Sequence, residues 1–353
     1  MNKKIGLSLS LALALCLTSA CAVKDNKSLS PEPVAKSTAA VAATSVGTDI
    51  NQYNNSAEKE AVKANLQAFF RCAKAQDPRA WFYLTDESQT LVNKFLAKAT
   101  ALADKKIAAQ KNNQELVAEI AVEMQDPTSK TAISFWQEKG QAVADEYATF
   151  DMDPSQLTIK IEGGAAKITT AKDPSLLLTM YRQRGFWKLA ADLQSSRATL
   201  DMQTSDYGTK CALFDAKAET EAVRKCFTEA LQYAKKGDAK LWSLLDNQCK
   251  EGIYSFFIVN MNNGAELDSA KIQELKSQIA QAFNEPNSEL ATEFCQARGQ
   301  VFVNNYGQID LNKGRVDINV IGDYAEFIDK KNNQVLLSFY KQDGTWKMAV
   351  RKI

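Results

Sequence analysis

The chain has 353 residues, with 43 basic and 42 acidic side chains and no histidine. The net charge of +1 gives no basic surface for nucleic acid, and the lack of histidine excludes Ser-His-Asp and Cys-His catalysis and the commonest metal ligand. No phosphate-binding or dinucleotide-binding glycine motif occurs. We therefore expect no cofactor and no enzyme of these common classes.

Residues 1–20 have the layout of a secretory signal peptide. "MNKK" precedes the apolar run "IGLSLSLALALCL" (5–17), which is too short to span a bilayer comfortably, and "TSAC" (18–21) follows. This ending resembles the lipobox of bacterial lipoproteins, with Thr18 where that family prefers leucine. The resemblance implies cleavage before Cys21 and a diacylglyceryl group on its thiol. Ordinary cleavage at "ACA" (20–22) is the alternative.

Residues 21–56 are small and polar with no apolar period, which predicts a flexible tether. Several acyl chains would give stable membrane attachment. Ala22 stands where aspartate often marks inner-membrane retention in lipoproteins, so the resemblance implies attachment to the outer membrane, facing the periplasm. Secretion or release into the periplasm without a lipid is the alternative.

Two long segments of the remaining chain match each other. "LLLTMYRQRGFWKLA" (176–190) matches "VLLSFYKQDGTWKMA" (335–349), and "AEKEAV" (57–62) matches "AETEAV" (218–223). The offset between matching positions is 161 for the segment at 57–62 and 159 for the segment at 176–190. This period is too long for a solenoid repeat but suits a domain. We predict tandem domains at 57–195 and 214–353, joined by a linker at 196–213.

Each copy has helical patterns first and strand patterns last. Val62, Leu66, Phe69 and Ala73 follow helical spacing, and further helices are expected within 88–125 and 249–284. The stretches that begin at Phe135 and Phe294 are ambiguous between helix and strand. Each copy ends with four short segments in which apolar and polar residues alternate. Asp343-Gly344, between the last two of these segments in the second copy, predicts a β-hairpin. The order predicts an α+β fold in which helices pack on one face of an antiparallel meander.

This order and the closing G-x-W-K strand, at 185–188 and 344–347, resemble the NTF2-like (cystatin-like) superfamily. The resemblance implies a curved sheet around a long helix, forming a cone with an apolar pocket. Members include binding modules, dimerising proteins and enzymes that use pocket Asp, Tyr or His. The pocket lining expected here for an apolar or aromatic ligand is Trp81, Tyr181, Trp187, Trp242, Tyr340 and Trp346.

The residues shared by both copies also allow an interpretation as fold maintenance. The tryptophans would pack against a helix, while Lys188 and Lys347 would face water. Further shared residues are Gln137/Gln296 and Tyr147/Tyr306. A carboxylate-and-tyrosine acid/base site would use Asp151 or Asp310, but turn formation explains these aspartates equally well.

Five cysteines remain beyond Cys16 and Cys21: Cys72, Cys211, Cys226, Cys249 and Cys295. They have no C-x-x-C spacing, so a metal site is not indicated. One or two disulfides in an exported protein and burial as small apolar side chains are both open.

Three functions fit these patterns. The first is a lipid-anchored binding or interaction module of the cell envelope, whose partner is an apolar small molecule or an envelope protein. The second is a histidine-free isomerase or dehydratase with an apolar pocket. The third is a structural or assembly lipoprotein that pairs through its sheets. We favour the first, because it requires only folded domains and an anchor.

The anchor can be tested by feeding cells a labelled fatty acid. We expect the wild type to incorporate the label and Cys21→Ser to lack it, because the thiol is the acylation site that the lipobox resemblance implies. Labelling of both proteins, or of neither, would contradict the lipid anchor.

Overall fold

The computed structural model describes residues 56–193 and 213–350, apart from gaps at 104–108, 110, 151–152, 163, 172–173, 175–176, 263–266 and 286–287. The expected signal peptide, Cys21 and the tether up to residue 55 lie outside the described residues. So do Asp151, Cys211 and residues 196–212 of the expected linker. The described chain divides into two compact units, with the boundary between Asp215 and Ala216. We call them the N-terminal and C-terminal units.

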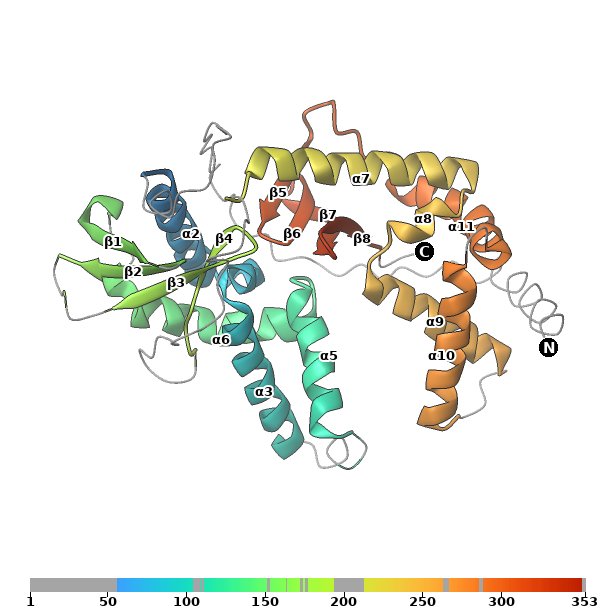
Figure 1. Cartoon of the computed structure of the whole chain (residues 1–353), viewed down its shortest axis with the longest axis horizontal. Coiled ribbons are helices and arrows are strands. Elements are labelled where there is room, and N and C mark those ends of the chain that lie inside the picture. Colours follow the sequence, from blue (N-terminus) through green and yellow to red (C-terminus); the bar gives the residue numbers. More distant parts are fainter. Residues whose placement is uncertain are drawn as a thin grey trace. The chain divides into compact units, whose positions relative to one another are not determined.

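The N-terminal unit begins with helices and ends with strands (Figure 1). Helix α2 packs against α6 and strand β4, and α3 packs along α5. The elements are α2 (Ser56–Lys74), η3 (Pro78–Tyr83), α3 (Asp86–Ala103), α5 (Asn113–Gln125), α6 (Lys130–Glu146), η4 (Ala148–Phe150), η5 (Pro154–Gln156), β1 (Leu157–Glu162), β2 (Ala165–Thr170), β3 (Leu178–Gln183) and β4 (Phe186–Leu189).

The C-terminal unit has the same order of helices and strands (Figure 1). Helix α7 packs against α11 and strand β8, and α9 packs along α10. The elements are α7 (Ala216–Lys236), α8 (Lys240–Ser243), α9 (Asn247–Met261), α10 (Ser269–Asn284), α11 (Glu289–Tyr306), β5 (Val316–Ile321), β6 (Tyr324–Asp329), β7 (Gln334–Gln342) and β8 (Thr345–Ala349).

Each sheet is a four-stranded antiparallel meander, in the orders β1-β2-β3-β4 and β5-β6-β7-β8. The last hairpin of each sheet turns through two residues with positive φ, Arg184-Gly185 and Asp343-Gly344. Two successive residues of this kind suit a tight turn between twisted strands. The predicted α+β class, the meander and the Asp343-Gly344 hairpin are confirmed.

The two ambiguous stretches are both helical, in α6 and α11. Their buried residues recur at matching positions: Phe135, Trp136 and Gly140 in α6, and Phe294, Cys295 and Gly299 in α11. Packing of this face against α2 or α7 outweighs the strand preference of the valines in "QVFVNNY" (300–306). We call two residues of different units equivalent when they are separated by a fixed offset in the sequence. The offset is 161 positions for residues in α2, η3 and α3, and 159 positions for residues from α5 to the end of the unit.

The first helix of each unit forms one wall of its core. Val62, Leu66, Phe69 and Ala73 on α2 have no exposed surface, which confirms the predicted face. On α7 the equivalent face is buried in the same way, with Val223, Phe227, Ala230 and Ala234. Burial of a large apolar side chain contributes about 1.5–3 kcal/mol, so this face is a principal source of stability.

A glycine lets two helices approach closely in each unit. A Cβ at Gly140 of α6 would lie 2.5 Å from the carbonyl oxygen of Ala73 on α2. A Cβ at the equivalent Gly299 of α11 would meet the carbonyl oxygen of Ala234 on α7 in the same way. In both units the helices can approach this closely only because glycine has no side chain.

We therefore expect Gly140→Ala and Gly299→Ala each to lower the free energy of unfolding of its unit, by about 1–3 kcal/mol, because the methyl group forces the helices apart. Gly252→Ala is the matched control, since Gly252 lies in α9 with no atom within 4 Å of a Cβ. This control should stabilise its helix by about 0.5–1 kcal/mol. Peptide-resolved hydrogen exchange on the whole chain reports each unit separately. If hydrogen-exchange protection in Gly140→Ala equalled that of the wild type, the helices would not approach each other this closely.

Candidate functional site

The six residues expected to line a pocket lie at separate places within their units. Trp81 is on η3 and Trp242 is on α8, whereas the other four are on the last two strands of each sheet. Tyr340 is partly exposed and the other five are buried: Trp81, Tyr181, Trp187, Trp242 and Trp346. None of the six belongs to the lining of the cavity described in the N-terminal unit.

The tryptophans of the last strands bind a carboxylate near the start of the first helix. Trp187 Nε1 donates to Glu58 Oε2 at 2.7 Å, and Trp346 Nε1 donates to Glu219 Oε2 at 2.8 Å. The two glutamates are equivalent, as are the two tryptophans. The same hydrogen bond therefore joins β4 to α2 and β8 to α7.

A basic residue on the neighbouring strand completes each cluster. Arg182 Nη1 lies 3.1 Å from Glu58 Oε1, and Lys341 Nζ lies 2.6 Å from Glu219 Oε1. The side chains of Arg182 and Glu58 are 2% and 5% exposed, against 25% and 20% for Lys341 and Glu219. The ion pair is thus buried in the N-terminal unit and open to solvent in the C-terminal unit.

Glu58 is the described carboxyl group that most invites a catalytic interpretation. Burial raises its pKa, and the hydrogen bond from Trp187 and the charge of Arg182 only partly offset this, so the pKa stays above its ordinary value. Perturbed carboxyl groups are common in acid/base sites. However, the indole occupies one oxygen and the guanidinium the other. Because the cluster recurs in both units, we interpret it as structural.

Lys188 does not face water as expected, since it is only 4% exposed. Its Nζ lies 3.2 Å from Asp86, the first residue of α3, which also accepts hydrogen bonds of 2.7 and 2.9 Å from Arg184. Burial alone would raise the pKa of Asp86, but the hydrogen bond from Arg184 and the charges of Lys188 and Arg184 outweigh it and lower the pKa to about 2. The start of α3 therefore covers the lysine. The equivalent Lys347 donates to the carbonyl oxygen of Ser243 at 2.7 Å.

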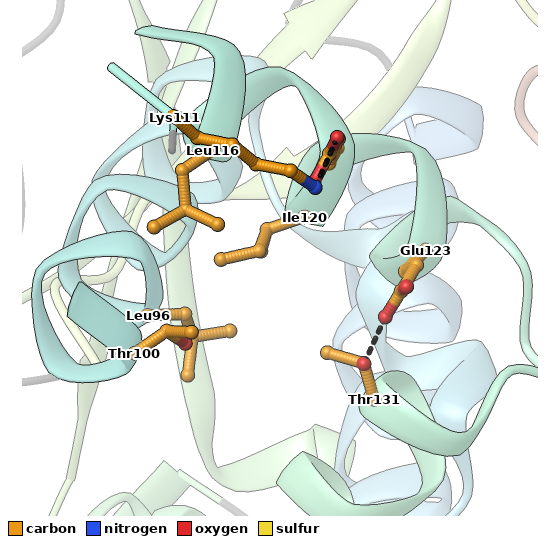
Figure 2. Close-up of a pocket in the computed structure, with 8 residues that line it drawn as sticks. Leu96, Thr100, Lys111, Leu116, Ile120, Glu123 and Thr131 are labelled. Atoms are coloured by element: carbon orange, nitrogen blue, oxygen red, sulfur yellow. Dashed lines mark hydrogen bonds and ion pairs between the residues drawn. The ribbon is translucent and has the colours of Figure 1, made fainter. Parts of the chain in front are cut away.

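The N-terminal unit contains a cavity of about 220 Å³ between α3, α5 and α6 (Figure 2). Its apolar part is formed by Leu96, Leu116 and Ile120, and the last two are buried. Exposed charged side chains from the start and the outer turns of α5 form its rim. The complete lining is Leu96, Thr100, Lys111, Leu116, Glu119, Ile120, Glu123 and Thr131.

The C-terminal unit contains a cluster of aromatic rings among its helices. Trp242 stacks on Phe283 with ring centroids 4.1 Å apart, and Phe257 lies 5.7 Å from Phe283. Tyr254 and Phe294 complete this aromatic cluster. Each ring therefore has neighbours in the cluster, whose members come from α8, α9, α10 and α11.

In the N-terminal unit three of these five rings are replaced by smaller groups. Tyr254, Phe257 and Phe283 are equivalent to Asn93, Leu96 and Met124, respectively. The aromatic residues at the two other positions are kept, as Trp81 and Phe135. Of these three positions only Leu96 lines the cavity, so the exchange of Phe257 for Leu96 is the one that bears on it directly. Aligning the two units and comparing side-chain volumes would have revealed this exchange from the sequence.

The interior of the N-terminal unit also holds polar atoms without hydrogen-bond partners among the described residues. They are Asn93 Oδ1, Trp81 Nε1, Trp136 Nε1 and the Tyr147 hydroxyl. Leaving a buried polar group unpaired costs roughly 1–3 kcal/mol, so several in one unit are unusual. In the C-terminal unit, the indole of Trp242 donates to Asn284 at 3.3 Å.

The described residues give no support to the acid/base site of a carboxylate and a tyrosine. Asp310 caps a turn, because its carboxylate accepts from the backbone N–H of Asn312 at 2.9 Å. This hydrogen bond lowers the pKa of Asp310. Burial raises the pKa of Tyr147 well above its usual value, so its hydroxyl stays protonated. Asp151 lies outside the described residues.

The described cysteines are all buried, which agrees with the alternative that they are small apolar side chains. Cys226 and Cys295 are free thiols, and burial raises the pKa of each to about 12, which makes them poor nucleophiles. The thiols of Cys226 and Cys249 each donate to a backbone carbonyl oxygen at 3.2 Å. Cys211 lies outside the described residues.

The two carboxylate–indole clusters can be compared by Glu58→Ala and Glu219→Ala. We expect Glu58→Ala to cost its unit about 3–5 kcal/mol, because Arg182 then stays buried without this carboxylate. Glu219→Ala should cost about 1–2 kcal/mol, since Lys341 can be solvated and only the bond to the indole is lost. Hydrogen exchange resolved by peptide on the whole chain measures both. Equal losses would mean that burial of the N-terminal cluster has no energetic consequence.

Among the described residues, no helix is long and apolar enough to cross a membrane, and no group of three or more Cys, Asp or Glu residues could hold a metal ion. Comparison of the chain with protein-family models, curated proteins and solved structures found no match in any of the three.

Proposed function

We propose that this protein is a lipid-anchored binding module of the cell envelope, and that the cavity between α3, α5 and α6 is its binding site. The observation that carries the proposal is the cavity itself, whose apolar part is formed by Leu96, Leu116 and Ile120. At the position of Leu96 the C-terminal unit has Phe257, a member of its aromatic cluster. Small-molecule sites are concave, mainly apolar and supplied with a few polar groups. The cavity combines three apolar lining residues with polar and charged groups at its rim.

A buried polar atom lies on the helix that bears Leu96. Asn93, at the position of Tyr254, is 7% exposed and has an unpaired side-chain oxygen. It lies on the same face of α3 as Leu96 and Thr100, because the spacings of three and four residues place all of them on one face. Asn93 is outside the cavity lining, so the proposed site does not depend on it.

We also propose that the two units are tandem copies of one NTF2-like domain. Besides the shared order of elements, the same long-range backbone contact recurs at equivalent positions. The N–H of Thr85 donates to Leu189 at 3.0 Å, and that of Asp246 donates to Met348 at 2.9 Å. Contacts that repeat in this way support duplication better than the order of elements alone.

Export and lipid attachment rest on the first 21 residues, as argued from the sequence. The lipid would hold the protein at the membrane, in our proposal the outer membrane, while residues 21–56 would let the folded units reach a ligand or an envelope protein nearby.

The other two functions have less support. An isomerase or dehydratase needs an available acid or base, and both oxygens of Glu58 are occupied. Pairing through sheets needs a wide apolar patch on strands. The exposed large apolar side chains of the described residues lie instead on α3, α5 and α9 and just before β3: Phe95, Leu102, Val122, Leu177, Phe256 and Val259.

The site can be tested by exchanging one side chain between the units. We expect benzene to shift the methyl NMR signals of Leu116 and Ile120 in the wild type. Leu96→Phe, which installs the ring of Phe257, should abolish the shift and stabilise the N-terminal unit by filling the cavity.

Phe257→Leu is the matched control in the C-terminal unit. It should destabilise that unit by about 1–3 kcal/mol while leaving the benzene response of the N-terminal unit unchanged. Benzene shifts that persist in Leu96→Phe, or that are missing in the wild type, would refute the proposed site.

A further inference from the structure

We infer that the cavity selects a small amphiphilic amine: an apolar body that fills the space between Leu96, Leu116 and Ile120, with an ammonium group at the rim. The inference rests on the proposed binding function and adds the chemical class of the ligand. Its basis is the distribution of charge and hydrogen-bond acceptors around the cavity (Figure 2).

The charged groups that line the rim have a net negative charge. They are the ammonium group of Lys111 and the carboxylates of Glu119 and Glu123. Lys111 Nζ lies 2.6 Å from Glu119, so its charge is already matched by that carboxylate. This leaves the charge of Glu123 without a basic partner in the lining, which favours a cation over an anion.

Glu123 also keeps hydrogen-bonding capacity. Its Oε2 accepts from the hydroxyl of Thr131, and an ionised carboxylate offers about four acceptor positions. A ligand ammonium group, with three N–H donors, complements such a group. A ligand that donates hydrogen bonds therefore suits the carboxylate of Glu123, whereas a ligand carboxylate would place acceptor against acceptor. The dashed line in Figure 2 between Glu123 and Thr131 marks the side of the cavity where the head group would bind.

The volume sets the size of the ligand. A cavity of roughly 150 Å³ binds benzene. By proportion, the space of about 220 Å³ takes about nine non-hydrogen atoms. An aromatic or aliphatic amine of that size matches the cavity, whereas a long acyl chain exceeds it.

The test compares three probes of similar size and different charge, by methyl NMR and calorimetry on the whole chain. They are 2-phenylethylamine, 2-phenylethanol and 3-phenylpropanoate. We expect the amine to bind about three- to tenfold more tightly than the alcohol, and the carboxylate to bind most weakly, as for a partly exposed charge contact. Added salt should reduce the advantage of the amine.

Glu123→Gln should bring the amine close to the alcohol without weakening the alcohol. Glu60→Gln is the matched control: it removes the same charge from α2, outside the cavity lining, and should leave the amine's advantage intact.

Equal binding of all three probes, or tightest binding of the carboxylate, would overturn the amine inference and leave the proposed binding function standing. An amine advantage that survives Glu123→Gln would also overturn it. If no probe binds the wild type, or if binding is unchanged in Leu96→Phe, the proposed site fails together with the inference.

Discussion

The hydrogen bond from the last-strand indole to the first-helix carboxylate is the contact on which each unit depends. It joins the two ends of the unit in sequence, Glu58 to Trp187 and Glu219 to Trp346, so the helices and the meander must both be formed before it can exist. Bonds to charged acceptors are about twice as strong as neutral ones, especially where water is excluded. The bond therefore fixes how the sheet lies on its helix and, through the helices, where the remaining elements pack.

On this shared frame the two units use their helical hairpins differently. In the C-terminal unit, Trp242, Phe257 and Phe283 form a continuous aromatic cluster. In the N-terminal unit Leu96 stands at the position of Phe257 and lines a cavity of about 220 Å³. Its exposed charged rim admits water, so this cavity does not carry the full free-energy cost of a dry apolar cavity.

Much of the fold could be predicted from the sequence because local patterns carry it. The buried face of α2 follows from the spacing of Val62, Leu66 and Phe69, and the final hairpin follows from Asp343-Gly344. The charged clusters could not be predicted in the same way. Glu58 lies in the first turn of a polar-looking helix, and Lys188 on the predicted outer face of a strand. Their burial is decided by residues about a hundred positions away, Arg182 and Asp86 respectively.

The site escaped prediction for a different reason: a cavity is defined by atoms that are missing. Aromatic residues drew attention in the sequence, yet Trp81 and Trp187 pack as core residues, whereas the cavity is lined by Leu96, which stands at the position of Phe257. Agreement between the units therefore marks the frame that both keep, such as the indole and its carboxylate. A difference at an interior position, such as Leu96 for Phe257, marks where the two units pack differently, and it is at Leu96 that the N-terminal unit has a cavity.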